Sequence, residues 1–249
     1  MANIDQTRKR VDEVSRFYED HGAHFARTRF ALWPWMREIA MRVLPGMTVV
    51  DVGAGNARFL EAFGNDVRYV GIEPSSALRD AAKPKLHEKA SIEYGLLPHL
   101  DVENAIADLT TCIAVFHHLP RSLHHSSMQE LIRITKPGGL ICISVWNARG
   151  KGFLRYPLAW VAAWLRVSFW KGLHSGECYV PWKSGTSIAN RYVYAWTKTA
   201  LQKLGEEYGE VISCEYVDDE KTGVWNGKNI VLVVKKYRDR SLDKNAFYS

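Results

Sequence analysis

The run from Thr48 to Asn56 reads TVVDVGAGN, a β-branched stretch followed directly by glycines at alternate positions. Valine and threonine favour a strand, and Gly53 and Gly55 let the backbone turn sharply and approach a ligand that a Cβ atom would exclude. Residues 56–63 then have helical spacing, and a second β-rich run follows at residues 67–72. This order predicts a strand, a tight turn, a helix and a second strand.

The rest of the chain repeats this alternation of apolar runs and turn signals. Strands separated by helices favour a parallel sheet, and two successive strands at the end add an antiparallel edge. We therefore predict one α/β domain over residues 1–249, with a doubly wound, mostly parallel, Rossmann-like sheet of about seven strands. An N-terminal helical cap is expected at about 8–44 and an apolar helical insertion at about 150–190. The other predicted strands are residues 91–94, 112–116, 140–146, 211–217 and 224–235, and the other predicted helices are residues 121–135 and 197–207.

The composition is that of a packed globular protein. Hydrophobic residues make up 47% and charged residues 24%, which excludes a disordered, collagen-like or disulfide-framework chain. Lys and Arg number 33 against 27 Asp and Glu, and the net charge of +6 suits a polyanionic partner. The four cysteines form no C-x-x-C pair, which argues against a metal site in this chain. The first ten residues lack the apolar core of a signal peptide, so we expect a cytoplasmic protein.

The most apolar stretch is residues 153–170, and we expect it to be a helix packed on its own domain. Arg155, Pro157 and Arg166 interrupt it, and the charge-free part, residues 156–165, is well short of the roughly 20 residues that a membrane span requires. We therefore expect no membrane partner. A partner-docking face or a substrate lid is the second interpretation of this segment, and an interfacial membrane helix is the third.

The turn at residues 51–56 lacks the glycine patterns of dinucleotide-binding and ATP-binding turns, and this narrows the class of ligand it can hold. A dinucleotide-binding turn continues to a third glycine, but position 58 is Arg, and no G-x-x-x-x-G-K follows. The remaining D-x-G-x-G pattern is typical of a cradle for a charged amino-acid moiety. Glu73 ends the second strand about 20 residues beyond, where a carboxylate can accept hydrogen bonds from both ribose hydroxyls. The pair indicates an adenosyl ligand, and an ordinary strand-to-helix turn is the alternative.

With the apolar fourth strand and the run KPGG at residues 136–139, these features resemble the class I S-adenosylmethionine-dependent methyltransferases. The resemblance covers about Met47 to Trp146 and implies S-adenosylmethionine as the cofactor. The residues that it implies for cofactor binding are Tyr18, Asp51, Gly53, Ala54, Gly55, Asn56, Glu73, Pro74, Leu96, Leu97, Ile113 and Ala114.

A closer resemblance extends beyond that core. Its pieces are residues 17–25 (FYEDHGAHF), 28–30 (TRF), 33–34 (WP), 113–118 (IAVFHH), 145–146 (VW), 180–182 (VPW) and 191–192 (RY). Together they are similar to the tRNA wobble-uridine carboxymethyl methyltransferases over most of residues 14–236. The resemblance implies an enzyme that esterifies the carboxylate of 5-carboxymethyluridine at the wobble position. It also implies the tRNA anticodon stem-loop and a small zinc-binding activator subunit as partners.

The chain departs from that family's pattern at three places. Ala57 replaces a loop glycine, and residues 93–98 (EYGLLP) lack the usual acidic residue near the adenine. The segment at residues 149–177 is short and apolar where eukaryotic relatives often carry a long polar insertion. We therefore expect the adenine contacts and the partner contacts to differ from those of the family.

Methyl transfer to a carboxylate requires positioning rather than a general base, because a carboxylate with a pKa near ~4 is already ionised at pH 7. A guanidinium can hold a carboxylate or a phosphate bidentately. The resemblance places two arginines beside the active site, one for the substrate carboxylate and one for a phosphate or the cofactor carboxylate. Two histidines follow the fourth strand, where an open parallel sheet holds its ligands, and half-buried structural histidines are the alternative. The predicted catalytic residues are Arg29, His117, His118 and Arg191, and the predicted substrate-binding residues are Trp33, Trp146 and Tyr192.

Basic residues gather at both ends of the chain, at residues 8–10 (RKR) and 235–240 (KKYRDR). They are either ordinary surface charge or a contact for anticodon-stem phosphates. Trp33 is either a substrate or cofactor contact or a core-filling aromatic. Two other functions stay open: a small-molecule methyltransferase acting on a carboxylic acid or a quinone, and a catalytically silent RNA-binding module on the same scaffold.

Overall fold

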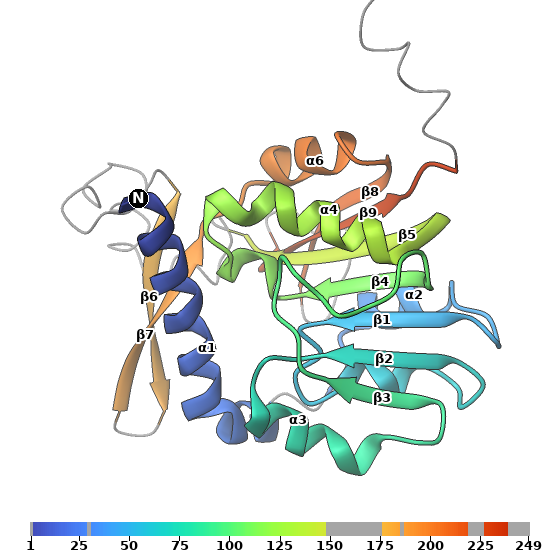
Figure 1. Ribbon diagram of the computed structural model, residues 1–249, viewed down its shortest axis with the longest axis horizontal. Helices are drawn as coiled ribbons and strands as arrows, with labels where there is room; N and C mark the ends of the chain where they lie inside the picture. The colour runs from blue at the N-terminus through green and yellow to red at the C-terminus, as the bar shows by residue number, and fades with distance from the viewer. Residues whose placement is uncertain (1, 29–30, 148–175, 185–186, 219–226, 239–249) are drawn as a thin grey trace, which may run out of the picture.

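The computed structural model describes residues 2–28, 31–147, 176–184, 187–218 and 227–238. Its main sheet has seven strands, of which the first five in the chain are parallel (Figure 1). The predicted doubly wound α/β fold is confirmed, and the antiparallel strand lies one place in from the edge. The order across the sheet is β3 (Ala90–Glu93), β2 (Arg68–Ile72), β1 (Thr48–Val52), β4 (Ala107–Ile113), β5 (Thr135–Trp146), β9 (Asn229–Lys235) and β8 (Glu210–Val217).

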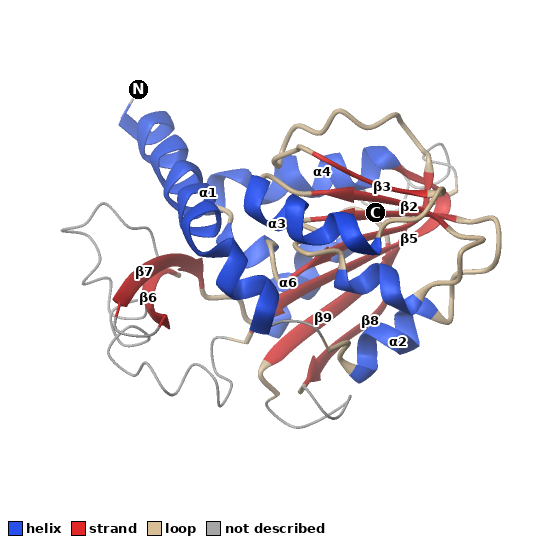
Figure 2. Ribbon diagram, turned by 90° about the horizontal axis from the view of Figure 1, so that it is seen from below, coloured by secondary structure: helices blue, strands red, loops and turns tan. Residues whose placement is uncertain are grey.

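Helices cover both faces of this sheet, which explains why its strands read as continuous apolar runs. In Figure 1, α4 (His124–Ile134) passes in front of the strands and α2 (Pro34–Ala40) lies behind them, and Figure 2 shows the two helices on opposite sides of the strand layer. All of β1 is buried, and its Val49 and Val50 join the apolar clusters on opposite faces, as neighbours in a strand do. Two further helices of the described chain are α3 (Ser76–Ala82) and α6 (Lys198–Glu206).

The glycine turn leads into a shorter helix than the sequence indicates. We expected a helix over residues 56–63, but the structure has a 3₁₀ helix, η1 (Arg58–Ala62). It begins after Ala57, whose φ is +50°. A left-handed residue interrupts the backbone hydrogen bonds of a regular helix, so the helix cannot start at residue 56.

The fourth strand also ends earlier than predicted. Its expected end was residue 116, but β4 stops at Ile113, and Ala114 has a φ of +58°. A 3₁₀ turn, η3 (Phe116–His118), follows. This turn places His118 at the carboxyl edge of the sheet.

The predicted N-terminal cap corresponds to α1 (Ala2–Thr28) and α2. Helix α1 packs against α3 and against a strand pair that stands apart from the main sheet, at the carboxyl ends of its parallel strands (Figure 1). Among the residues that the structure describes, no helix combines the length and the hydropathy needed to cross a bilayer.

That strand pair corrects the predicted helical insertion at residues 150–190. Its described end is an antiparallel pair, β6 (Glu177–Ser184) and β7 (Ser187–Tyr194), rather than helix. Cys178, Val180 and Val193 are buried in a small apolar cluster together with Trp146. Cys178 and Val180 are two residues apart and lie on the same face of β6, which is the spacing of a strand rather than of a helix. The apolar helix expected at residues 153–170 lies outside the described residues.

Candidate functional site

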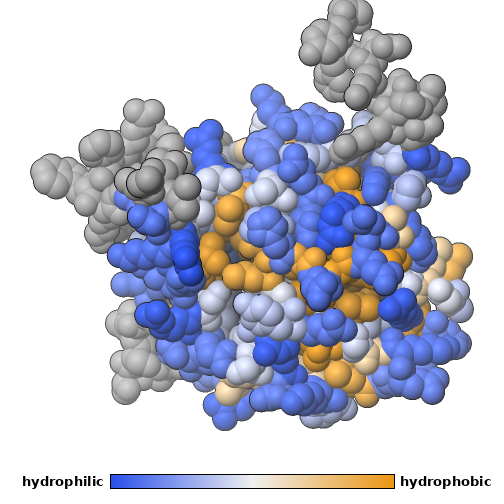
Figure 3. All heavy atoms as spheres, in the orientation of Figure 1, coloured by the Kyte–Doolittle hydropathy of each residue, from blue (hydrophilic) through white to orange (hydrophobic). Residues whose placement is uncertain are grey.

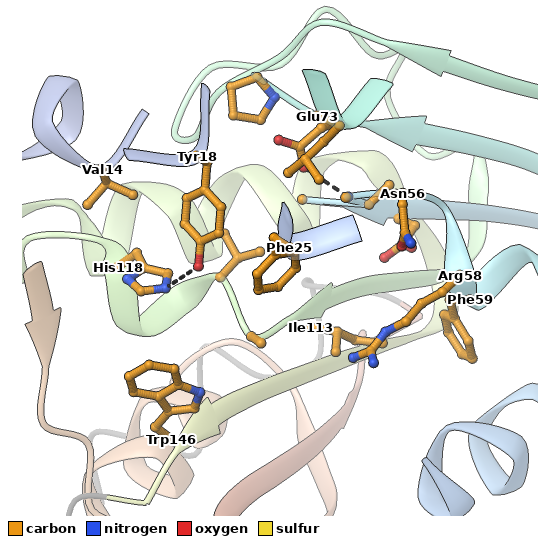
Figure 4. A pocket seen from close by; sticks show the side chains of 18 of the residues that line it. Val14, Tyr18, Phe25, Asn56, Arg58, Phe59, Glu73, Ile113, His118 and Trp146 are labelled. Atoms are coloured by element: carbon orange, nitrogen blue, oxygen red, sulfur yellow. Dashed lines mark hydrogen bonds between the residues drawn. The ribbon is translucent and has the colours of Figure 1, made fainter. Parts of the chain in front are cut away.

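A cavity of about 960 Å³ lies between α1, the carboxyl ends of the central strands and the β6–β7 pair. Figure 4 shows Tyr18, His118 and Trp146 on one side of it, Asn56, Arg58 and Phe59 on the other, and Glu73 beyond the glycine turn. Most predicted site residues border this cavity. They are Tyr18, Trp33, Asp51, Gly53, Ala54, Gly55, Asn56, Glu73, Pro74, Leu96, Ile113, Ala114, His118, Trp146 and Arg191.

The two glycines of the turn, Gly53 and Gly55, are required for different structural reasons. Gly53 has φ +75°, and a Cβ atom there would lie 2.1 Å from Val115 Cγ2, so packing excludes a side chain. Gly55 has φ +58°, and a Cβ atom there would have no neighbour within 4 Å, because this position borders the cavity. The turn therefore forms a cradle that a side chain at Gly55 would begin to fill.

Glu73 directly follows β2 and lies beside this cradle. Its Oε2 accepts a hydrogen bond from Gly55 N at 2.9 Å and its Oε1 from Ser75 N at 3.0 Å. Burial raises the pKa of Glu73 to about 7, although the two backbone donors oppose the shift. A carboxylate that burial has stripped of water gains from further donors, and the two hydroxyls of a ribose supply them. The cradle and Glu73 together fit an adenosyl ligand.

Asp51 also borders the cavity, but its oxygens are engaged within the sheet. They accept hydrogen bonds from Tyr69 OH on β2 at 2.7 Å and from Thr111 Oγ1 on β4 at 2.6 Å. Burial raises the pKa of Asp51, and the hydrogen bond from Thr111 opposes that shift. Asp51 therefore ties β1 to both of its neighbours directly below the glycine turn.

At the other end of the cavity, three side chains form a hydrogen-bonded chain. His118 Nδ1 lies 2.9 Å from the carbonyl oxygen of Tyr192, which can only accept, so Nδ1 carries the proton. His118 Nε2 then accepts from the Tyr18 hydroxyl at 2.9 Å, and Arg191 Nη1 donates to the same hydroxyl oxygen at 3.2 Å. Burial, with Arg191 nearby, lowers the pKa of His118 to about 3, so the imidazole is neutral at pH 7.

Arg191 lies among aromatic rings. Its Cζ is 4.3 Å from the Trp146 ring centroid and 5.3 Å from that of Phe17. The residue is only 6% exposed, its Nε has no hydrogen-bond partner, and no carboxylate of the described chain lies within 4 Å of it. The aromatic faces stabilise the cation in part, and its charge is left for an anion that enters the cavity.

Three of the predicted residues that the structure describes are not part of the cavity lining. A further predicted residue, Arg29, lies outside the described residues. Leu97 is buried in the main apolar cluster, and His117 stacks on Trp146 with centroids 4.6 Å apart, one layer behind the cavity. Tyr192 follows Arg191 on β7, so it points to the opposite face of the strand, where Arg10 Cζ lies 5.2 Å from its ring centroid.

Several residues of the lining are not among the predicted ones. Arg58 is one of them, and its position directly after the glycine cradle is the sequence signal for it. Apolar residues of α1 and β6 also border the cavity, and for Phe25 and Val180 the signal was the family resemblance at residues 17–25 and 180–182. The missed apolar residues include Val11, Val14, Phe25 and Val180.

A protein-family model described as a methyltransferase domain matches residues 17–212. The tRNA (carboxymethyluridine(34)-5-O)-methyltransferase of Arabidopsis thaliana is 31% identical over 136 residues, which cover 54% of this chain and 33% of that protein. The corresponding enzyme ALKBH8 of Macaca fascicularis is 28% identical over 146 residues, which cover 58% of this chain and 21% of that protein. The matched region is thus a third or less of these relatives.

Solved structures share the fold at low identity. A SAM-dependent methyltransferase of Methanosarcina mazei has a TM-score of 0.64 at 13% identity, covering 84% of this chain and 99% of that one. A putative methyltransferase of Haloferax volcanii, solved in complex with the Trm112 methyltransferase activator, has a TM-score of 0.54 at 17% identity. That match covers 90% of this chain and 93% of the other.

Proposed function

Because the chain belongs to the methyltransferase domain family, we propose that it methylates the carboxylate of 5-carboxymethyluridine at the wobble position of tRNA, with S-adenosylmethionine as methyl donor. Bound at the glycine cradle and Glu73, the donor supplies an electrophilic methyl carbon: a carboxylate oxygen forms the new O–CH₃ bond as the S–CH₃ bond breaks, giving a neutral ester and a neutral thioether. In this proposal Arg191 and Tyr18 orient the acceptor, and Trp146 contacts it. His118 orients Tyr18.

The buried guanidinium of Arg191 is the observation that supports an anionic acceptor most strongly. Holding a cation in a site that is largely closed to water is unfavourable unless an anion compensates it. An acceptor carboxylate supplies that anion and matches the planar donor pattern of arginine. A neutral acceptor would leave the charge of the Arg191 guanidinium uncompensated.

The protonation state of His118 supports the same acceptor class. A base whose pKa is about 3 is too weak to take a proton from a hydroxyl or an amine. The carboxylates of the described lining are Asp51 and Glu73, and both lie at the donor end of the cavity. Their oxygens already accept hydrogen bonds from hydroxyls or backbone N–H groups. A carboxylate acceptor needs no deprotonation, so this arrangement suits it.

A second candidate is a small apolar carboxylic acid. The acceptor side of the cavity includes Val11, Val14 and Val180, and an aliphatic wall favours an apolar molecule. The outward face of α1 carries charges of both signs, among them Asp12, Arg16 and Asp20, and in Figure 3 the region where α1 lies is mostly hydrophilic. This mixture is not the basic track that RNA phosphates favour.

In the proposed function the protein binds the tRNA anticodon stem-loop and a small zinc-binding activator subunit. The names of the relatives support the first, and the activator complex of the Haloferax protein supports the second by analogy of fold.

Nucleoside mass spectrometry tests the proposal. Transfer RNA that carries 5-carboxymethyluridine is incubated with the protein, with and without a co-expressed activator, and with S-adenosylmethionine. We expect the wobble nucleoside to gain one methyl group as an ester. Unchanged tRNA together with methylation of short-chain carboxylic acids would favour the second candidate. No methylation and no binding of S-adenosylmethionine would favour a silent RNA-binding module instead.

A further inference from the structure

We propose that Arg58 binds the α-carboxylate in the amino-acid tail of the methyl donor. This inference rests on the proposed function, because it requires S-adenosylmethionine as the donor. Arg58 is the first residue of η1, directly after the glycine cradle, and its side chain borders the cavity.

The positions of the cationic side chains suggest that one binds the acceptor and another binds the donor. The described lining carries Arg58, Arg191 and Lys228 as its cationic side chains. Arg191 lies with Tyr18 and Trp146 at the acceptor end. Figure 4 shows Arg58 on the other side of the cavity from Trp146, beside Asn56. The proposed reaction brings two carboxylates into the cavity, one on the acceptor and one on the donor, and each end offers an arginine.

The direction of the donor follows from Glu73. If the ribose hydroxyls meet this carboxylate, the amino-acid tail runs along the glycine cradle, where Gly55 leaves open space. Arg58 follows Gly55 by three residues, so it stands where the cradle ends. A cation at this place matches the anionic end of the tail, and a guanidinium can hold a carboxylate through two N–H groups.

The Arg58 head group is held in place before any ligand arrives. Its Nη1 donates to the carbonyl oxygen of Ala31 at 3.2 Å, and its Cζ lies 4.1 Å from the Trp33 ring centroid. Trp33 in turn stacks on Trp35, which is buried in the core, with centroids 5.7 Å apart. A guanidinium fixed from both sides loses less side-chain entropy when it binds an anion. The same stack gives Trp33 a role in holding Arg58.

Calorimetry with two matched ligands tests the assignment. S-adenosylmethionine and its decarboxylated analogue share the adenosine, the sulfonium and the amine, and they differ only in the carboxylate. We expect the wild-type protein to bind the carboxylated ligand at least about tenfold more tightly. In Arg58→Met this ratio should fall to near one, while the affinity for the decarboxylated analogue stays within about twofold. Arg58→Lys should recover part of this affinity ratio, since lysine keeps the positive charge but lacks the paired N–H groups of the guanidinium.

Lys228→Met and Arg191→Met are matched controls, because each removes another cation that borders the cavity. Both should keep the wild-type ratio. A full ratio in Arg58→Met, or its loss in either control, would overturn the assignment and leave the proposed function standing. If neither ligand binds the wild-type protein, the donor itself is wrong and the proposed function fails with it. Thermal unfolding without ligand reports whether each variant is folded.

Discussion

The two ends of the cavity are built from different parts of the protein. At the donor end, a backbone cradle of glycines lies beside the Glu73 carboxylate, and these residues come from the turns that follow β1 and β2. At the acceptor end, aromatic and charged side chains meet from segments far apart in the chain, with Tyr18 on α1, Trp146 on β5 and Arg191 on β7. The donor end is fixed by the sheet, whereas the acceptor end depends on how α1 and the β6–β7 pair lie on it.

This difference suggests that binding of the donor and recognition of the acceptor can be changed independently. A backbone cradle tolerates few substitutions and suits one constant ligand. A wall of side chains can change its chemistry by substitution while the sheet stays the same. Variants at one end should therefore leave the affinity for the other ligand unchanged.

The largest effect is expected at the acceptor end. Arg191→Met should lower kcat/KM for a carboxylate acceptor about 100-fold, because it removes the charge-assisted hydrogen bonds that orient the acceptor. The dissociation constant for S-adenosylmethionine should stay within about twofold. Since a buried, uncompensated charge is also removed, the melting temperature without ligand should not fall. Steady-state kinetics, calorimetry and thermal unfolding measure the three quantities, and a loss of donor affinity equal to the loss of activity would break the separation of the two ends.

The next effect belongs to the cradle. Gly55→Ala should weaken donor binding by about 30-fold, because its Cβ atom enters the cavity and the residue is strained at φ +58°. Gly64→Ala is the matched control, since a Cβ atom there also has no neighbour within 4 Å, but Gly64 does not border the cavity. Calorimetry should show wild-type affinity for that variant. Equal affinities for the two variants would mean that the donor does not use the cradle.

Glu73 should make donor binding depend on pH. Its raised pKa means that the carboxyl takes up a proton as the pH falls through about 7, and the protonated form accepts ribose hydrogen bonds poorly. The dissociation constant should therefore rise by up to about tenfold per pH unit below 7. Calorimetry between pH 5.5 and 8.5 is the measurement, with Glu73→Gln as a control whose weaker affinity should be independent of pH. A flat wild-type profile would argue against ribose binding at Glu73.

The raised pKa of Glu73 also affects the stability of the protein without ligand. In the unfolded chain this carboxyl has its ordinary pKa of 4.5, so the folded state holds the proton more tightly between pH 4.5 and 7. The contribution is fully present below pH 4.5 and is lost as the pH rises through 7. Without the donor, the free energy of unfolding should fall by up to about 3 kcal/mol because of this group as the pH rises from 4.5 to 7, and thermal unfolding measures this change. In Glu73→Gln this dependence should disappear.

The smallest effect is expected at Tyr18. Tyr18→Phe removes the hydroxyl that links His118 to Arg191, which should reduce kcat/KM about fivefold, a value typical of one neutral hydrogen bond. Donor affinity should not change, because Tyr18 acts on the acceptor end. A Tyr18→Phe variant with weakened donor binding and normal kcat would place this residue at the wrong end of the cavity.

The donor end was the more predictable one because its residues are adjacent in the sequence. The strand, the glycines and Glu73 lie within 26 residues, from Thr48 to Glu73, and local patterns describe them. The acceptor end is assembled by tertiary packing from segments that are distant in the sequence. There the family motif suggested both Arg191 and Tyr192, but neighbours in a strand face opposite sides, so only one of them can border the cavity. The predicted helical insertion was wrong at its described end, because β6 and β7 pair with each other and bury Cys178, Val180 and Val193 in one apolar cluster.

The central claim is that the uncompensated charge of Arg191 selects an anionic acceptor. The most direct measurement compares methyl transfer from labelled S-adenosylmethionine to two tRNAs that differ at one wobble substituent, a 5-carboxymethyl group or the corresponding neutral 5-carbamoylmethyl group. We predict incorporation of label into the acid and none above background into the amide. Equal labelling of the two tRNAs would contradict the claim, because it would mean that the site does not recognise the negative charge.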